Sequence, residues 1–180
     1  MGVVGDPAVR LRQMLADCVG FRAWCNAANA TEALTRIHFD ALPAADDPDE
    51  NDAYGAEDFA GMRPYAIIYP DESAPQQMMR DGSPDCWSYQ GTMIVILSKT
   101  YDELEDGTPT DVFVQLADEI DSILSNDSPT EPGLQQMTVL PNYLGIKSID
   151  VHWQGRTPPE HRNDYGDAYD VLLRITWGSN

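Results

Sequence analysis

The sequence predicts an α+β protein in which a mostly antiparallel sheet of about four strands packs against two or three helices, with long acidic loops. Three observations predict this class. Apolar side chains alternate along 169–177, they repeat at helical spacing along 109–125, and acids without a single base accumulate along 46–58. Because side chains repeat every two residues in a strand and every 3.6 in a helix, the first two patterns indicate different elements. The third pattern is typical of a solvated loop.

Helices are expected first along the chain. Asp6-Pro7 suits a helix start, with Asp as the N-cap and Pro at the first helical position. A break or kink is expected at Gly20, and a second short helix from Thr31. We assign one domain to 1–180, with three parts in chain order: a helical N-terminal part (1–45), an acidic loop (46–62), and the sheet with the amphipathic helix 109–125 (63–180).

Three strands are expected besides the terminal one, over 64–69, 87–97 and 146–153. The first follows a proline, which is tolerated where a strand begins. Residues 70–85 are rich in Pro, Gln, Met, Asp and Gly and indicate a long exposed hairpin connection. We therefore expect 64–69 and 87–97 to form an antiparallel ribbon in the middle of the sheet.

The helix over 109–125 has a clear start signal. Thr108 provides a cap, Pro109 fits the first helical position, and Asp111 adds an acid in the first turn. Ten residues are expected in the core of the sheet and this helix: Ile67, Trp87, Ile94, Ile96, Phe113, Ile120, Leu124, Val171, Ile175 and Trp177.

The net charge of −19 comes from 30 acids and 11 Lys or Arg residues, and residues 1–45 are balanced. The whole excess therefore falls on 46–180. Such a surface repels phosphate backbones, which argues against tight wrapping on DNA or RNA. An acidic wall would instead let nucleic acid pass through a channel without sticking. No apolar run approaches the roughly 18 residues of a membrane span, and the start of the chain lacks the pattern of a secretory signal.

We assign no catalytic, cofactor-binding or metal-binding residue. Residues 47–58 place acidic or amide groups at positions 1, 3, 5 and 12 of a calcium loop, but Asp52 occupies the glycine position and Asp58 is shorter than the usual Glu. The acid pairs within 102–106 lie in a charged turn, where hydration keeps them ionised. Two alternatives stay open: a small soluble hydrolase with an acidic active site, and a calcium-binding interaction module.

Cysteines and tryptophans are expected to serve structure. Cys18 and Cys25 are seven residues apart in one expected helix, so they would lie about 10 Å apart along its axis, too far for a disulfide. We expect buried reduced thiols. The four tryptophans, Trp24, Trp87, Trp153 and Trp177, have apolar strand or helix neighbours and no accompanying basic groove, which favours core or interface positions.

The order of these elements resembles a known family. The matching pieces are a helical segment (7–19), a strand (63–69), the segment 85–97, the helix 111–125 and the terminal segment 166–177. Together they resemble the tail terminator (minor tail protein) family of long-tailed bacteriophages and, more broadly, head–tail completion proteins. The resemblance covers about two thirds of the chain. The extra residues at 20–62 and 70–85 depart from the compact family pattern.

The resemblance implies a sheet backed by helices, and a homo-oligomer that forms a six-fold ring without catalytic activity. Such a ring caps the tail tube, joins it to the head-connector proteins, and lets DNA pass without tight binding. The expected location is the virion, in the tail or neck, after synthesis in the host bacterial cytoplasm. Arg80, Arg156 and Arg162, in the long loops 70–85 and 155–167, are the candidate interface residues, because they offer positive charge to an acidic neighbouring copy.

Overall fold

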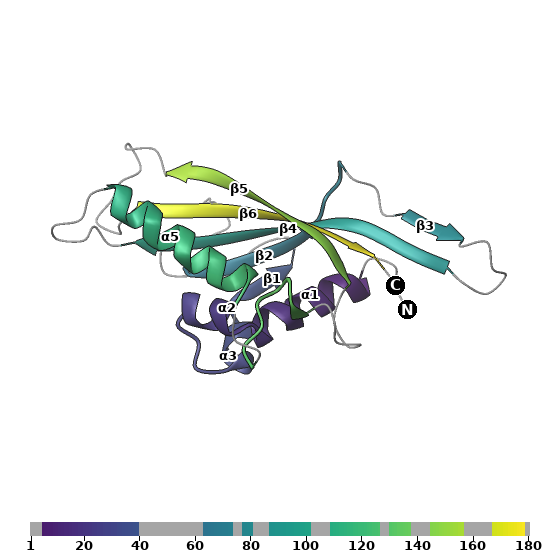
Figure 1. The fold of residues 1–180 in the computed structure, drawn as a ribbon, viewed down its shortest axis with the longest axis horizontal. Helices are drawn as coiled ribbons and strands as arrows, with labels where there is room; N and C mark the ends of the chain where they lie inside the picture. The colour runs from purple at the N-terminus through teal and green to yellow at the C-terminus, as the bar shows by residue number, and fades with distance from the viewer. Residues whose placement is uncertain are drawn as a thin grey trace, which may run out of the picture.

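A computed structural model describes residues 5–39, 63–73, 77–80, 87–101, 109–126, 130–137, 145–156 and 167–178 of the chain. The elements in these ranges are, in chain order, α1 (Gly5–Asp17), α2 (Val19–Trp24), α3 (Ala30–Leu34), β1 (Ile37–Phe39), β2 (Tyr65–Pro70), β3 (Gln77–Arg80), β4 (Trp87–Tyr101), α5 (Pro109–Leu124), β5 (Ile146–Arg156) and β6 (Asp167–Gly178). Figure 1 shows their arrangement.

The strands form one sheet in the order β1-β2-β4-β6-β5, and β3 pairs with β4 outside this path. Neighbouring strands run antiparallel except for β1, which pairs with β2 in parallel. The predicted α+β class and the mostly antiparallel sheet are confirmed. The four expected strands correspond to β2, β4, β5 and β6. In the described ranges, the sheet also contains the short strands β1 and β3, the latter inside the expected hairpin connection.

The short helix α3 begins with a reciprocal cap. The side-chain oxygen of Asn29 accepts a hydrogen bond from the backbone N–H of Glu32 at 3.0 Å, and the Glu32 carboxylate accepts one from the N–H of Ala28 at 2.8 Å. The first contact satisfies an N–H group that a helix start leaves unpaired, and the second ties the residue before the N-cap to the first turn. The helix therefore begins at Ala30, one residue before the start predicted at Thr31.

The N-terminal helical segment breaks at Cys18, not at Gly20. Cys18 has an extended backbone (φ −69°, ψ 119°) between α1 and α2, and its Sγ donates to the carbonyl oxygen of Ile123 in α5 at 3.5 Å. Gly20 lies inside α2, where a Cβ would stand 2.2 Å from the carbonyl oxygen of Ser122. Glycine is therefore needed there because the backbones of α2 and α5 approach closely. Cys18 and Cys25 are free and buried, as expected, although they do not share one continuous helix.

One hydrophobic core lies between the helices and one face of the sheet. On the helical side it contains residues from α1, α2, α3 and α5, which lie on the same side of the sheet in Figure 1. On the sheet side, fully or almost fully buried residues alternate along three neighbouring strands: Ala66, Ile68, Met93, Val95, Leu97, Val171, Leu173, Ile175 and Trp177. This alternation is the signature of a sheet with one covered face.

The predicted core is correct for Val171, Ile175, Trp177 and Ile120, which are buried, and Leu124 packs against the cluster as a partly buried residue. The assignment is wrong for three residues, which are only half-buried and lie on the opposite face of the sheet: Ile67, Ile94 and Ile96. The reason is that β2 and β4 carry large apolar residues on both faces, so alternation alone does not identify the core side. The side chains of Trp87 and Phe113 lie outside the described part.

Candidate protein–protein interface

The face of the sheet opposite the core carries a continuous apolar patch. Directly paired residues share a face, and the register aligns Ile67 with Ile96 and Ile96 with Leu172, while Tyr69 aligns with Ile94. All five side chains are half-buried. We call this patch, Ile67, Tyr69, Ile94, Ile96 and Leu172, the outer face. Every helix in the described ranges contributes its apolar side to the core on the other face, so none of them covers it.

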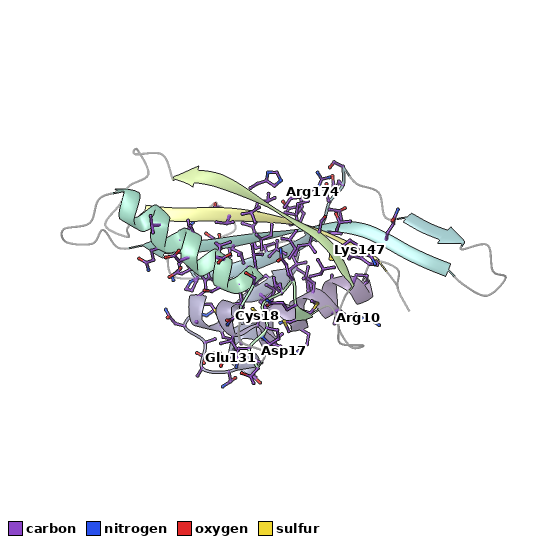
Figure 2. All side chains as sticks on the ribbon, viewed as in Figure 1. Arg10, Asp17, Cys18, Glu131, Lys147 and Arg174 are labelled. Atoms are coloured by element: carbon purple, nitrogen blue, oxygen red, sulfur yellow. The ribbon has the colours of Figure 1, made fainter. Side chains whose placement is uncertain are left out.

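An ion pair between the buried Asp71 and the partly exposed Arg174 borders the outer face on one side. Asp71 follows β2 and is only 7% exposed, and its Oδ2 lies 2.8 Å from Nε of Arg174 in β6. Its Oδ1 accepts hydrogen bonds from the hydroxyl of Ser73 at 2.6 Å and from the N–H of Ser73 at 2.9 Å. The Ser73 hydroxyl first, and then the Ser73 N–H and Arg174, hold the pKa of Asp71 below its usual value. These contacts fix the chain as it leaves β2. Figure 2 shows that Arg174 lies across the sheet from Cys18 in the helical layer.

Polar groups border the other side of the patch. Nε of Arg63 donates to the hydroxyl oxygen of Ser98 at 2.8 Å, and Ser98 is fully buried. Asp170 is the partner of Ser98 in the β4–β6 ladder, and its Oδ1 is buried without a hydrogen-bond partner in the described part of the chain. An apolar centre with charged residues at its margin has the composition of a protein-binding patch.

A two-stranded ribbon extends from this sheet. The ladder between β4 and β6 ends at the pair Gln90 and Gly178, and the ladder between β2 and β4 ends at Pro70 and Met93. Among the described residues, the part of β4 before Gln90 pairs with β3 alone, and the β3–β4 ladder covers residues 77–80 and 87–90. We call these two segments the β3–β4 ribbon. Figure 1 shows it running past the end of the helical layer, away from the core.

The long edge strand β5 is irregular in a way that discourages pairing with a further strand. Its register with β6 shifts between Ile146 and Ser148 and again between Gln154 and Arg156. Such bulges, together with the exposed Lys147 at the first of them, are devices that discourage another strand from adding to an edge. Contact through the outer face and the ribbon is therefore favoured over extension of the sheet at β5.

The three predicted interface arginines are not brought together by the described structure. Arg80 is the last residue of β3 and pairs with Trp87, and Arg156 is the last residue of β5 and pairs with Tyr169. β3 and β5 are not neighbours in the sheet. The described part does not include the side chains of Arg80 and Arg156 or any of Arg162. It also does not include the segment 47–58, which was considered as a calcium loop, or the acid pairs within 102–106. Sequence reasoning missed the outer face. The sequence feature that could have identified this face is that odd and even positions of β2 and β4 alike carry apolar residues.

Two of the four tryptophans occupy core positions, as expected. Trp24 and Trp177 are buried, with their rings in the hydrophobic cluster. The ammonium group of Lys99 lies 6.0 Å from the Trp24 ring and also pairs with Glu119 at 3.0 Å. The side chains of Trp87 and Trp153 lie outside the described part.

The described ranges contain neither a cluster of metal ligands nor a helix that could cross a membrane. No three His, Cys, Asp or Glu side chains there gather closely enough to hold a metal ion. None of the helices in those ranges reaches the length and apolar character that a membrane crossing requires. Comparison with protein-family models and with curated proteins finds no match.

Proposed function

We propose that this protein is a structural subunit of a bacteriophage tail end, a tail terminator or head–tail joining adaptor that assembles with copies of itself into a ring. Its partners would be the tail tube and the head-connector proteins, and its place the tail or neck of the virion. The observation that carries the proposal is the β3–β4 ribbon, which extends beyond the core of its own subunit.

A ribbon of this kind favours contact with another chain. Residues 77–80 and 87–90 pair with one another, and 87–89 lie beyond the last ladder contacts of β2 and β6. Two paired strands alone are at best marginally stable in water, because they bury little apolar surface. Support from a neighbouring subunit would stabilise the ribbon.

The outer face supplies a second contact surface. It presents half-buried isoleucine and leucine side chains on β2, β4 and β6. The ribbon is a separate surface, formed by β3 and the first residues of β4. A subunit with two different contact surfaces can bind one neighbour through each of them. Repetition of such a head-to-tail contact closes a ring when the rotation between subunits divides a full turn.

The charge of the chain fits a channel for DNA. Each copy carries a net charge of −19, so the wall of a ring would repel the phosphates of DNA passing through it. The same charge makes the copies repel one another. Because salt screens exposed charges beyond a distance of about 10 Å at 0.1 M, ring formation is expected to depend on ionic strength and on added magnesium.

The test is the mass of the chain in solution, followed by negative-stain imaging, at low salt, at high salt and with added magnesium. The proposal predicts annular particles whose population changes between these conditions. A variant in which a short Gly-Ser linker replaces residues 74–89 should keep the fold, because β2 and β4 still pair from Pro70 and Met93 onward. It should form fewer rings. Rings of unchanged stability in this variant, or a monomer under every condition, would contradict the proposal.

A further inference from the structure

The net negative charge of this protein does not extend to residues 1–45, which hold four Lys or Arg residues and four acids. Residues 5–39 hold four of the 11 Lys and Arg residues but only three of the 30 acids. Three of these arginines belong to one region, formed by α1, β1 and the turn between α3 and β1. We call Val9, Arg10, Arg12, Arg36 and Phe39 the basic edge.

Arg12 links α1 to the end of β1 and to the end of α3 within the basic edge. The Arg12 guanidinium lies 5.5 Å from the centre of the Phe39 ring, and its Nη2 donates to the carbonyl oxygen of Leu34 at 2.8 Å. Val9 precedes Arg12 by three residues in α1, so the two side chains are neighbours on one side of the helix. Val9 is 59% exposed and Phe39 is 38% exposed. The edge therefore combines positive charge with accessible apolar surface.

The positive charge of the basic edge also acts on the neighbouring His38. Burial first, and then the charges of Arg12 and Arg36, lower the pKa of His38. Both guanidinium groups thus act on one imidazole in β1. An anionic partner is favoured at this edge, whereas most of the chain repels one.

A complementary surface lies on α5. Val114, Asp118 and Asp121 follow one another at i, i+4 and i+7, which places them on one stripe of the helix. All three are exposed, and Val114 is 51% exposed. The opposite side of α5 is buried in the core through Leu116 and Ile120. We call Val114, Asp118 and Asp121 the acidic stripe.

The two surfaces match in composition. In the described ranges, the exposed large hydrophobic residues are Val9, Phe39 and Val114, so the basic edge holds two of them and the acidic stripe the third. Figure 1 shows α1 and α5 over different parts of the sheet, and Figure 2 places Arg10 at the end of α1 that is remote from α5. This separation suits a contact between two copies.

We propose that the basic edge of one copy binds the acidic stripe on α5 of the next copy, with the exposed apolar residues covered between them. This inference rests on the proposed function, because it names one contact of the ring. The contact joins two different surfaces, so it can repeat around a closed ring. Arginine suits it because its planar guanidinium can bind a carboxylate through two hydrogen bonds.

The test is a charge-reversal cycle between Arg10 and Asp118, with the assembly constant measured by sedimentation velocity. Arg10→Glu and Asp118→Lys should each weaken assembly about tenfold or more, and the combined variant should restore most of the loss. Arg10→Lys should keep most of the assembly. All variants should keep the far-ultraviolet circular dichroism and the melting temperature, because both residues are exposed.

The matched control is Glu131→Lys, an exposed acid in the 130–137 segment that Figure 2 shows away from Arg10. It changes the net charge by the same amount as Asp118→Lys and reduces the mutual repulsion of the copies equally. It should leave assembly unchanged or strengthen it.

Four outcomes overturn the inference. Asp118→Lys could behave like Glu131→Lys, or the combined variant could fail to restore assembly while rings still form, and either result leaves the proposed function standing. The same holds if Arg10→Glu abolishes binding to vesicles of anionic phospholipid without changing ring formation. A wild-type chain that stays monomeric under every condition overturns the inference and the proposed function together.

Discussion

Two adjacent leucines in β6 allow the two faces of the sheet to be compared directly. Leu173 is fully buried on the core face, where its ladder partners are Val95 and Val151. Leu172 is half-buried on the outer face, beside Ile96. Because the two residues are consecutive in one strand, Leu173→Ala and Leu172→Ala remove the same atoms from opposite faces.

The two substitutions are expected to lower the free energy of unfolding by clearly different amounts. Leu173→Ala removes a fully buried side chain and leaves a cavity, which costs about 3–4 kcal/mol of the free energy of unfolding. Leu172→Ala loses about half of a transfer free energy of roughly 2 kcal/mol and encloses no cavity, so its cost is about 1 kcal/mol. The difference between the variants is therefore about 2–3 kcal/mol.

The assay is urea unfolding of the monomeric protein, followed by far-ultraviolet circular dichroism, together with particle mass under assembly conditions. Leu173→Ala should lower the unfolding midpoint strongly. Leu172→Ala should lower it slightly but reduce the population of assembled particles. Equal unfolding costs for the two variants would show that the outer face is covered within the monomer, and would refute its assignment as a contact surface.

Three further predictions concern single residues. Gly20→Ala should destabilise the fold by about 2 kcal/mol, because the added Cβ would stand 2.2 Å from the α5 backbone. Helix propensity alone predicts a gain of about 1 kcal/mol instead. The sign of the change measured by urea unfolding therefore decides between close backbone packing and helix propensity. The hydrogen bonds from Ser73 and the pair with Arg174 lower the folded-state pKa of Asp71, so the stability that its carboxylate contributes is present at neutral pH and is lost as the pH falls through that lowered value. The free energy of unfolding measured below about pH 4 should therefore decline less in Asp71→Asn than in the wild type. Equal slopes in the two proteins would contradict this. Asn29→Ala should cost about 1 kcal/mol through loss of the α3 cap, Asn29→Asp should retain most of the stability, and equal losses in the two variants would argue against the cap.

The sequence was sufficient for the main elements where periodicity was unambiguous. Along β6, Val171, Leu173 and Ile175 face the core, whereas Asp170 and Arg174 occupy the other face. One strand with a polar side and an apolar side identifies its own orientation. The amphipathic helix was predictable for the same reason, because its apolar residues recur at helical spacing.

The sequence was insufficient where both sides of a strand are apolar. Ile94 and Ile96 alternate with Met93 and Val95, so local pattern does not show which set meets the helices. The register decides it, because Ile94 pairs with Arg174 on the polar side of β6. Register is a tertiary property, and a shift of one residue would exchange the two faces.

The basic edge was also beyond a local analysis. Arg12 and Phe39 are separated by 27 positions and meet because β1 returns beside β2 as a short parallel strand. Parallel pairing between segments that are distant in sequence leaves no short-range signal. The overall charge of −19 further obscures a local excess of arginine.

The central claim, that the chain acts as a ring-forming subunit, is tested most directly by its mass in solution with added magnesium. The subunit has a mass of 20.0 kDa, and the proposal predicts a closed species near six times that value, seen as annular particles by negative staining. A single 20.0 kDa species at every protein concentration and ionic strength would contradict it.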